Sequence, residues 1–271
     1  MTAEVSHTKP PVFEESSQYR HWRFSSSQLW NTRQTSNSTA VERLKNNAGE
    51  GSEATTLQYL SVQDEMSLCR FYEKQLQGIC KHLKFSDLVM VDLGGLTCLF
   101  LATKSESERI SIDDFGKNLR LPSTSGVLDL EYSVSQGLKF EYYVYHPYRP
   151  AYGFFLDMQA KADIKLLKET YAKVDQVIAE ILLTDLPLIY QPSQLALAAF
   201  TIAGKENGFE AHVRMYIEEK FPRHADVLLR IIHEASEILK KSTPVALEVA
   251  KEIDRRLNLC MNPAKNPSSA L

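Results

Sequence analysis

The chain has 271 residues, a length that suits one large domain or two small ones. Hydrophobic residues make up 44% and charged residues 24%, the ordinary mixture of a globular protein. The net charge of −3 lacks the basic excess of proteins that follow nucleic-acid phosphates, so direct nucleic-acid binding is disfavoured. No apolar run approaches the ~18 residues of a membrane helix, and residues 1–15 lack the order of a secretory signal, so neither is expected.

The residue types that usually carry chemistry are scattered. No C-x-x-C or H-x-x-x-H pair occurs, so we expect neither a metal site nor a disulfide framework, and we expect reduced, buried thiols. The four cysteines are Cys69, Cys80, Cys98 and Cys260. No Ser-His-Asp set and no Gly-rich phosphate loop is visible, so the sequence predicts no catalytic residues and no cofactor.

Residues 1–56 are polar and include the low-complexity run Gln34–Thr39 (QTSNST). Such a stretch buries too little apolar surface to offset the entropy of ordering it. One aromatic and cationic island, Tyr19–Phe24 (YRHWRF), interrupts it. The island is typical either of a docking arm or of a loosely packed tail, and the residues alone leave both open.

Helical periodicity begins near residue 60, and strand-like alternation is nearly absent, so the sequence predicts an all-α fold. Acidic Asp64 and Glu65 suit the first turn of a helix over 62–84. Residues 96–102 and 195–203 are apolar on every face, which is typical of helices buried on all sides. The remaining expected helices cover 112–119, 127–138, 150–160, 166–186, 212–221, 227–239 and 245–259.

A stiff segment with two prolines, His146–Pro150, separates two similar halves, so we place a domain boundary there. Leu96–Lys104 lies over Leu197–Lys205, an offset of 101 residues, and both halves then run short helix, longer helix. Amphipathic helices also match by chance, but the shared order and lengths favour a repeat. Upstream of its central helix the first half has only residues 85–95 where symmetry predicts a further helix, so one helix is expected to be missing.

Two bundles around buried central helices, joined by a short linker, resemble the cyclin architecture, and short segments resemble cyclin H in particular. The segments are Ser17–Ser25 (SQYRHWRFS), Met66–Lys74 (MSLCRFYEK), His146–Pro150 (HPYRP) and Leu183–Leu197 (LTDLPLIYQPSQLAL). The resemblance covers residues 16–260 and implies two tandem cyclin boxes, the first truncated, with N- and C-terminal flanking helices. The implied parts are an arm (1–56), a first box (57–146), a second box (147–243) and a C-terminal helix and tail (244–271).

The resemblance implies a regulatory subunit and not an enzyme. Cyclins of this type bind and activate the cyclin-dependent kinase of the CDK-activating kinase. With a RING-finger assembly factor they form the kinase module of TFIIH, which supports transcription by RNA polymerase II and cell-cycle control. The implied partners are therefore the kinase catalytic subunit, the assembly factor and the TFIIH core, in the nucleus, with no cofactor, membrane or direct nucleic acid.

The resemblance also assigns kinase-binding residues. Cyclins hold the mobile C-helix of the kinase with a Lys at the end of the third helix and a Glu in the fifth. The matching positions are Lys104 (in LATK) and Glu131, which stands nine residues before Phe140. The apolar candidates beside this pair are Phe100, Leu101 and Leu130, and those of the arm are Trp22 and Phe24. The former could also be plain core, and the arm could dock on the boxes or touch the kinase.

Two alternative functions stay open. A cyclin-fold transcription factor of the TFIIB kind would bind DNA. Such a protein should have a basic face and a zinc ribbon, and neither the net charge of −3 nor the scattered cysteines fit these features. A shortened cyclin that does not activate a kinase follows from the missing helix. Losing that helix would expose one side of residues 96–102, at a cost of ~1.5–3 kcal/mol for each large apolar side chain.

Overall fold

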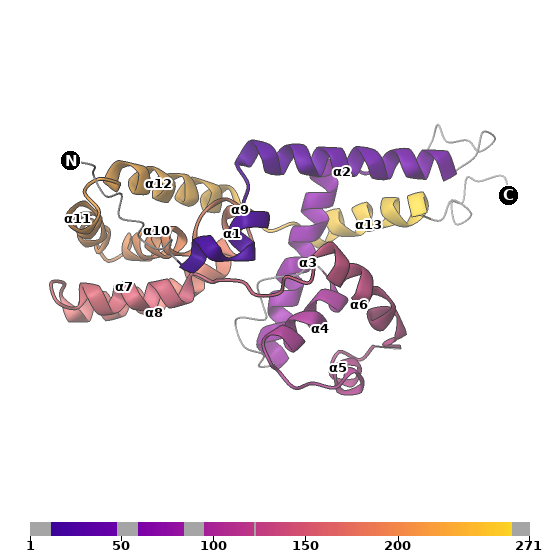
Figure 1. Ribbon diagram of the computed structural model, residues 1–271, viewed down its shortest axis with the longest axis horizontal. Helices are drawn as coiled ribbons and strands as arrows, with labels where there is room; N and C mark the ends of the chain where they lie inside the picture. The colour runs from indigo at the N-terminus through magenta and orange to yellow at the C-terminus, as the bar shows by residue number, and fades with distance from the viewer. Residues whose placement is uncertain (1–11, 48–58, 84–94, 122, 262–271) are drawn as a thin grey trace, which may run out of the picture. The chain divides into compact units, whose positions relative to one another are not determined.

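The structure is a computed structural model that describes residues 12–47, 59–83, 95–121 and 123–261 (Figure 1). Within these ranges it is helical and has no β-strand, which confirms the predicted all-α class. The elements in chain order are η1 (Val12–Glu15), α1 (Ser17–His21), α2 (Ser26–Asn47), α3 (Val62–Leu83), α4 (Leu96–Ser105), α5 (Ile112–Asn118), α6 (Ser125–Gly137), α7 (Tyr148–Met158), α8 (Ile164–Ile181), α9 (Leu186–Ile189), α10 (Pro192–Gly204), α11 (Glu210–Lys220), α12 (Ala225–Lys241) and α13 (Leu247–Met261).

The chain folds into two compact units, each built from segments that are distant in the sequence. The first unit combines residues 1–23 with 125–237, and the second combines residues 24–124 with 238–271. These units group the segments differently from the expected parts, whose boundaries after residues 56, 146 and 243 stay predictions.

The core of the first unit forms around α10, which packs against α7, α8 and α11. This helix begins with Pro192 in its first turn and a capping box between Gln191 and Gln194, which satisfies backbone donors at its N-terminus. Phe200 at its centre is fully buried, as are Val174 and Ile178 of α8. The prediction of a central helix apolar on all faces is therefore confirmed for this half.

Gly204 allows the next helix to begin close to the end of α10. A Cβ atom at this position would lie 3.0 Å from the backbone nitrogen of Glu210 and 3.0 Å from the Cβ atom of Phe209. These contacts are tighter than ordinary van der Waals packing, so a side chain here would push α11 away from α10.

The second unit holds a core between α3 and α13, and a short aromatic core between α4 and α5. Its cluster of apolar residues is Leu60, Leu68, Ala250 and Ile253, against which Phe71, Val245 and Leu257 pack. Asp64 of α3 accepts a hydrogen bond from Arg256 of α13 at 2.6 Å, and this ion pair is largely shielded from solvent. The contact with Arg256 and the hydrogen bonds from Ser61 hold the pKa of Asp64 below its usual value, against the opposing effect of desolvation.

The long helix α2 runs through the polar stretch that was expected to bury too little to become ordered. Most of its side chains are exposed, as expected, but residues 26–47 form a helix, so the expectation that they stay unordered is wrong. Leu29 is buried, and the Asn37 amide donates hydrogen bonds of 2.9 Å both to the backbone oxygen of Leu60 and to the Glu65 carboxylate. These few anchors order a helix whose sequence carries little apolar periodicity.

Two helix ends differ from the predictions. The helix predicted over 166–186 ends at Ile181, and a separate short helix follows that has Pro187 in its first turn. The predicted break at His146–Pro150 is shorter than expected, because α7 already starts at Tyr148. Pro150 fits there, since the first turn of a helix needs no backbone donor from it.

The expectation of buried thiols is only partly met. Cys260 is buried and Cys98 is half-buried, but Cys69 is exposed because it lies on the outer side of α3. The predicted loss of a helix falls on residues 85–95, and 84–94 lie outside the described residues.

Candidate functional site

The C-terminal turn of α4 carries the predicted lysine of the kinase clamp. Lys104 is exposed, and its Nζ atom lies 4.5 Å from the centre of the Phe100 ring, a cation–π contact. Its position in the last turn is favoured by the helix dipole. Phe100 and Leu101 are 3% and 5% exposed, and the Phe100 ring centre lies 5.2 Å from that of Phe115. These two apolar candidates are therefore core residues, and Phe100 is the one that contacts the lysine.

Helix α6 carries the other half of the predicted clamp. Glu131 is half-buried, and its backbone oxygen accepts a hydrogen bond of 2.6 Å from the Ser135 hydroxyl. Leu130 is 56% exposed and Tyr132 is 67% exposed. A half-buried carboxylate between exposed apolar side chains is an arrangement that suits contact with another protein, because burial there would strengthen its hydrogen bonds.

The predicted residues thus fall into two groups. Phe100, Leu101 and Lys104 lie together on α4 in the second unit, and Leu130 and Glu131 lie together on α6 in the first. A joint action of Lys104 and Glu131 stays a prediction.

The arm residue Trp22 is held by a carboxylate that the sequence analysis missed. Its indole Nε1 donates a hydrogen bond of 2.9 Å to Glu141, and the Nδ1 atom of His21 lies 2.7 Å from the same carboxylate. Lys139 lies over the Trp22 ring, 5.8 Å from its centre. Phe24 is half-buried and belongs to the second unit. Glu141 was inconspicuous because a single acidic residue in an aromatic run has no motif of its own.

The charge of Glu141 is stabilised by its partners. Desolvation acts to raise the pKa of Glu141, but the donors Trp22 and His21 and the nearby Lys139 outweigh it and hold that pKa below its usual value. The carboxylate therefore remains ionised at neutral pH and accepts both hydrogen bonds.

The remainder of the arm is joined to the same segment of the first unit. The Gln18 side chain donates to the backbone oxygen of Tyr145 at 3.4 Å and accepts from the Tyr145 nitrogen at 2.8 Å. Phe13 packs edge-on against both Tyr19 and Tyr145. Arg23 donates to the backbone oxygen of Ile189 at 3.3 Å. Of the predicted arm, residues 12–23 are thus joined to Tyr145 and Ile189 of the first unit, and from here on the arm means these residues.

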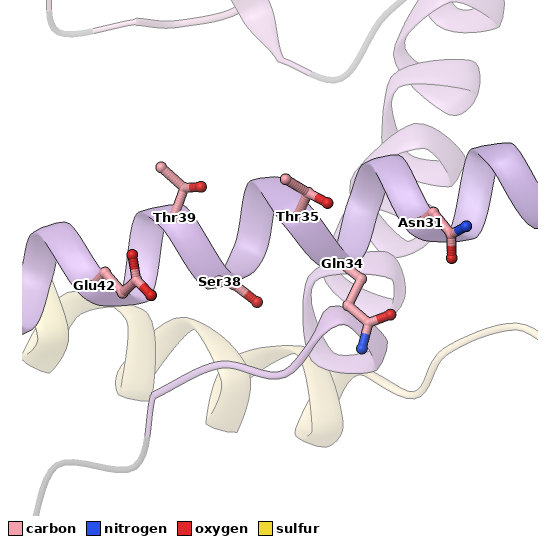
Figure 2. A pocket seen from close by; sticks show the side chains of 6 residues that line it. All are labelled: Asn31, Gln34, Thr35, Ser38, Thr39 and Glu42. Carbon is pink, nitrogen blue, oxygen red and sulfur yellow. The ribbon is translucent and has the colours of Figure 1, made fainter.

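The described residues include a polar pocket that lies along a single helix. Six side chains of α2 line a shallow pocket (Figure 2), and they are Asn31, Gln34, Thr35, Ser38, Thr39 and Glu42. A lone carboxylate among amides and hydroxyls lacks the acid–base pair that proton transfer requires. No group of three or more potential ligands that could hold a metal ion occurs in the described part of the chain. Nor is any helix there both long and apolar enough to cross a membrane.

Comparison with known sequences identifies the second half most clearly. Residues 146–240 match the family model of the cyclin C-terminal domain. The chain is 31% identical to Cyclin CCL1 of Saccharomyces cerevisiae over 78% of its own length, and it spans only 61% of the length of that relative. It is 28% identical to Cyclin mcs2 of Schizosaccharomyces pombe, with 96% of this chain and 88% of the relative covered. Cyclin-H of Xenopus laevis is 24% identical, with 92% and 87% covered.

Comparison with solved structures shows the same fold. A chain in the structure of the CAK complex of Chaetomium thermophilum bound to ATP-gamma-S superposes with a TM-score of 0.80 at 22% identity, covering 94% of this chain and 95% of that one. A chain of the yeast TFIIK (Kin28/Ccl1/Tfb3) complex gives a TM-score of 0.66 at 29% identity, covering 83% and 99%. In sequence and in fold the chain therefore resembles cyclin H and its yeast relatives, and its residues 146–240 match the cyclin C-terminal domain.

Proposed function

We propose that this protein is the regulatory cyclin subunit of a CDK-activating kinase, and that it binds and activates a cyclin-dependent kinase without being an enzyme itself. The yeast structure to which it is similar contains Kin28 and Tfb3 together with the cyclin Ccl1. By extension, the partners proposed for this chain are a kinase catalytic subunit, a RING-finger assembly factor and the TFIIH core in the nucleus. A role in transcription and in cell-cycle control is part of the same proposal.

The observation that carries the proposal is the exposure of apolar side chains along both flanks of α6. Leu128 and Tyr132, one helical turn apart, share one flank, and Leu130 lies on the other; all three are exposed, although large apolar side chains are usually buried. Half-buried Glu131 lies between the two flanks, on the same side of the helix as the buried Val127 and Ser135. A protein gains affinity from such groups when a partner covers the apolar side chains and supplies N–H donors to the carboxylate.

The proposed mechanism stabilises one state of the kinase. A protein kinase is active only when the Glu of its C-helix pairs with the Lys that binds the nucleotide phosphates. A cyclin that binds this helix in its inward position shifts the equilibrium toward that state. Lys104 would donate to backbone oxygens at one end of a bound helix, and Glu131 would accept from backbone N–H groups. The buried Phe100 gives Lys104 a rigid base, since a docked lysine loses less entropy when its stem is already packed.

Co-expression with a CDK-activating kinase catalytic subunit tests the proposal. We expect the two chains to copurify and the kinase activity of the complex to exceed that of the kinase alone. The variant Lys104→Ala/Glu131→Ala should lose most of this activation with unchanged helix content by circular dichroism. Lys205→Ala is the matched control, because Lys205 ends the corresponding helix of the other half. Full activation by the double variant would refute the assignment of the site.

A second candidate function is a cyclin form that binds a kinase but does not activate it. The alignment with Cyclin mcs2 extends over 291 residues, more than the 271 of this chain, so the relative contains segments without a counterpart here. If a box helix is among these segments, the kinase would be bound with lower stability. Insertion of the corresponding helix from a relative between residues 84 and 95 should then raise activation above that of the natural chain.

A further inference from the structure

The turn that follows α6 has an unusual backbone. Lys139 and Phe140 are consecutive residues with φ angles of 55° and 57°, in the left-handed region that favours glycine. The turn is closed by hydrogen bonds from the nitrogen of Phe140 to the oxygen of Ser135 at 2.8 Å and from the nitrogen of Lys139 to the oxygen of Gln136 at 3.0 Å. Two side-chain-bearing residues in this conformation persist only when surrounding contacts hold them.

The arm supplies those contacts on the next residue. Glu141 directly follows the strained pair, and it accepts hydrogen bonds from Trp22 and His21 of the arm. Lys139, the first of the strained residues, lies over the Trp22 ring. The arm therefore contacts the turn at two points, at Lys139 within the turn and at Glu141 directly after it.

This turn presents aromatic rings to solvent. Phe140 is 55% exposed and Tyr143 is 66% exposed. The Phe140 ring centre lies 6.2 Å from that of Tyr132 on α6, and Tyr143 packs edge-on against Tyr145 at 5.0 Å. Exposed aromatic rings with fixed positions are the side chains that contribute most to protein–protein affinity.

Because the Phe140 ring lies against Tyr132, these rings continue the exposed flank of α6 that Tyr132 forms with Leu128, one helical turn before it. We propose that the arm acts as a second clamp, distinct from the pair Lys104 and Glu131. Through its hydrogen bonds to Glu141 the arm holds Tyr132, Phe140 and Tyr143 in the geometry that binds the kinase catalytic subunit. The inference rests on the proposed function and deepens it. Phe140 and Tyr143 are contact residues in this scheme, whereas Trp22, His21 and Glu141 are positioning residues.

Titration of the full-length chain with the purified kinase catalytic subunit tests the clamp. Phe140→Ala and Glu141→Ala should each weaken binding by about tenfold, the range of a central interface residue. Trp22→Phe, which keeps the ring and removes the donor, should weaken it by about threefold, since one charge-assisted hydrogen bond is lost. Glu169→Ala, an exposed glutamate of α8, is the matched control and should bind as the natural chain does. Circular dichroism establishes that each variant folds.

A rescue experiment separates positioning from direct contact. Lys139→Gly removes the left-handed strain at the first residue of the turn, so the conformation of the turn should then depend less on the hydrogen bonds between Glu141 and the arm. In the Glu141→Ala background this change should restore most of the lost affinity, and in the natural chain it should change affinity by less than about twofold.

Three results would overturn parts of the account, and they are distinguishable. Absence of any binding by the natural chain would remove the proposed function itself. Binding by the natural chain with equal binding by Glu141→Ala would remove the clamp. A loss of binding by Glu141→Ala that Lys139→Gly leaves unrestored would make Glu141 a contact residue and would refute its positioning role.

Discussion

The two halves of the repeat, α4 to α6 and α10 to α12, share the order of their helices but use the same positions differently. Lys104 at the end of α4 lies over an aromatic ring, whereas Lys205, at the equivalent position, donates a hydrogen bond of 3.1 Å to Ser236 within its own unit. The position of half-buried Glu131 corresponds to Ile232 in the second half, which is buried. The second half therefore has a lysine equivalent to that of the proposed kinase clamp but lacks an equivalent carboxylate.

The exposed sides of α6 and α12, the last helix of each half, differ in the same way. On α6, Leu130 and Tyr132 are exposed, while their counterparts on α12 are half-buried Ile231 and exposed His233. The sequence of α12 carries charges of both signs along its length, whereas that of α6 carries only two carboxylates. At these equivalent positions the second half, here called the framework half, therefore uses its apolar groups for its own core, whereas α6 leaves Leu130 and Tyr132 exposed, which is where we propose that the partner binds.

The largest effect is expected from the core of the framework half. Phe200→Ala removes a fully buried ring at the centre of α10 and should lower the free energy of unfolding by about 3–5 kcal/mol. Urea denaturation followed by the fluorescence of Trp22, in a Trp30→Phe background, measures this loss in the first unit. A loss below about 1 kcal/mol would show that α10 is not the centre of the framework.

The buried His146, which lies between the two halves in the sequence, predicts that the stability of the chain depends on pH. His146 is buried, neither of its ring nitrogens has a hydrogen-bond partner among the described residues, and burial lowers its pKa to about 4. In the unfolded chain the imidazole of His146 binds a proton near pH 6.5, whereas in the folded chain it does so only near pH 4. The free energy of unfolding is therefore highest above pH 6.5 and falls by about 3 kcal/mol in total as the pH is lowered toward 4.

The replacement His146→Phe should flatten this dependence between pH 6.5 and 4, as measured by urea denaturation at several pH values. An equally steep dependence in the variant would mean that other groups cause it.

A negative charge introduced on α6 should weaken kinase binding, whereas the same charge introduced on α12 should not. Leu130→Asp places a carboxylate among the apolar groups of α6 and should weaken binding of the kinase subunit by about tenfold, with a change in stability within about 0.5 kcal/mol. Arg230→Asp on the exposed side of α12 is the matched variant and should leave binding unchanged. Equal effects of the two charges would erase the distinction between the faces.

The smallest expected effect concerns the lysine of the framework half. Lys205→Met deletes its hydrogen bond to the buried Ser236 and should destabilise the chain by about 0.5–1.5 kcal/mol. Thermal unfolding measures the change, and kinase activation should be unaffected. Reduced activation at unchanged stability would place Lys205, too, in the interface.

Much of the fold was predictable from the sequence, because amphipathic and all-apolar periodicities report directly on burial. Every helix expected between residues 62 and 259 is present, including the central helix around Phe200. Helix α2 was missed because its stability depends on a few tertiary anchors, such as Leu29 and Asn37, that periodicity does not register. The end of α8 was misplaced because the pattern of apolar residues continues past it.

The candidate site was predictable only in part. Lys104 and Glu131 came from resemblance to a family, since a lysine at a helix end has no signal of its own. The burial of Phe100 and Leu101 follows from the apolar character of α4, which left their role open between core and contact. Glu141 was missed because its importance arises from residues more than a hundred positions away, Trp22 and His21, which only the fold brings to it.

The most direct test of the account is the affinity of the kinase catalytic subunit for two matched double variants, measured by isothermal titration. Lys104→Ala/Glu131→Ala should raise the Kd by roughly 30- to 150-fold, since about 2–3 kcal/mol is lost with two partly shielded charged contacts. Lys205→Ala/Ser236→Ala removes the lysine equivalent to Lys104 together with its hydrogen-bond partner, and it should stay within about twofold of the natural chain. Similar affinities for both variants, or no measurable binding by the natural chain, would contradict the account.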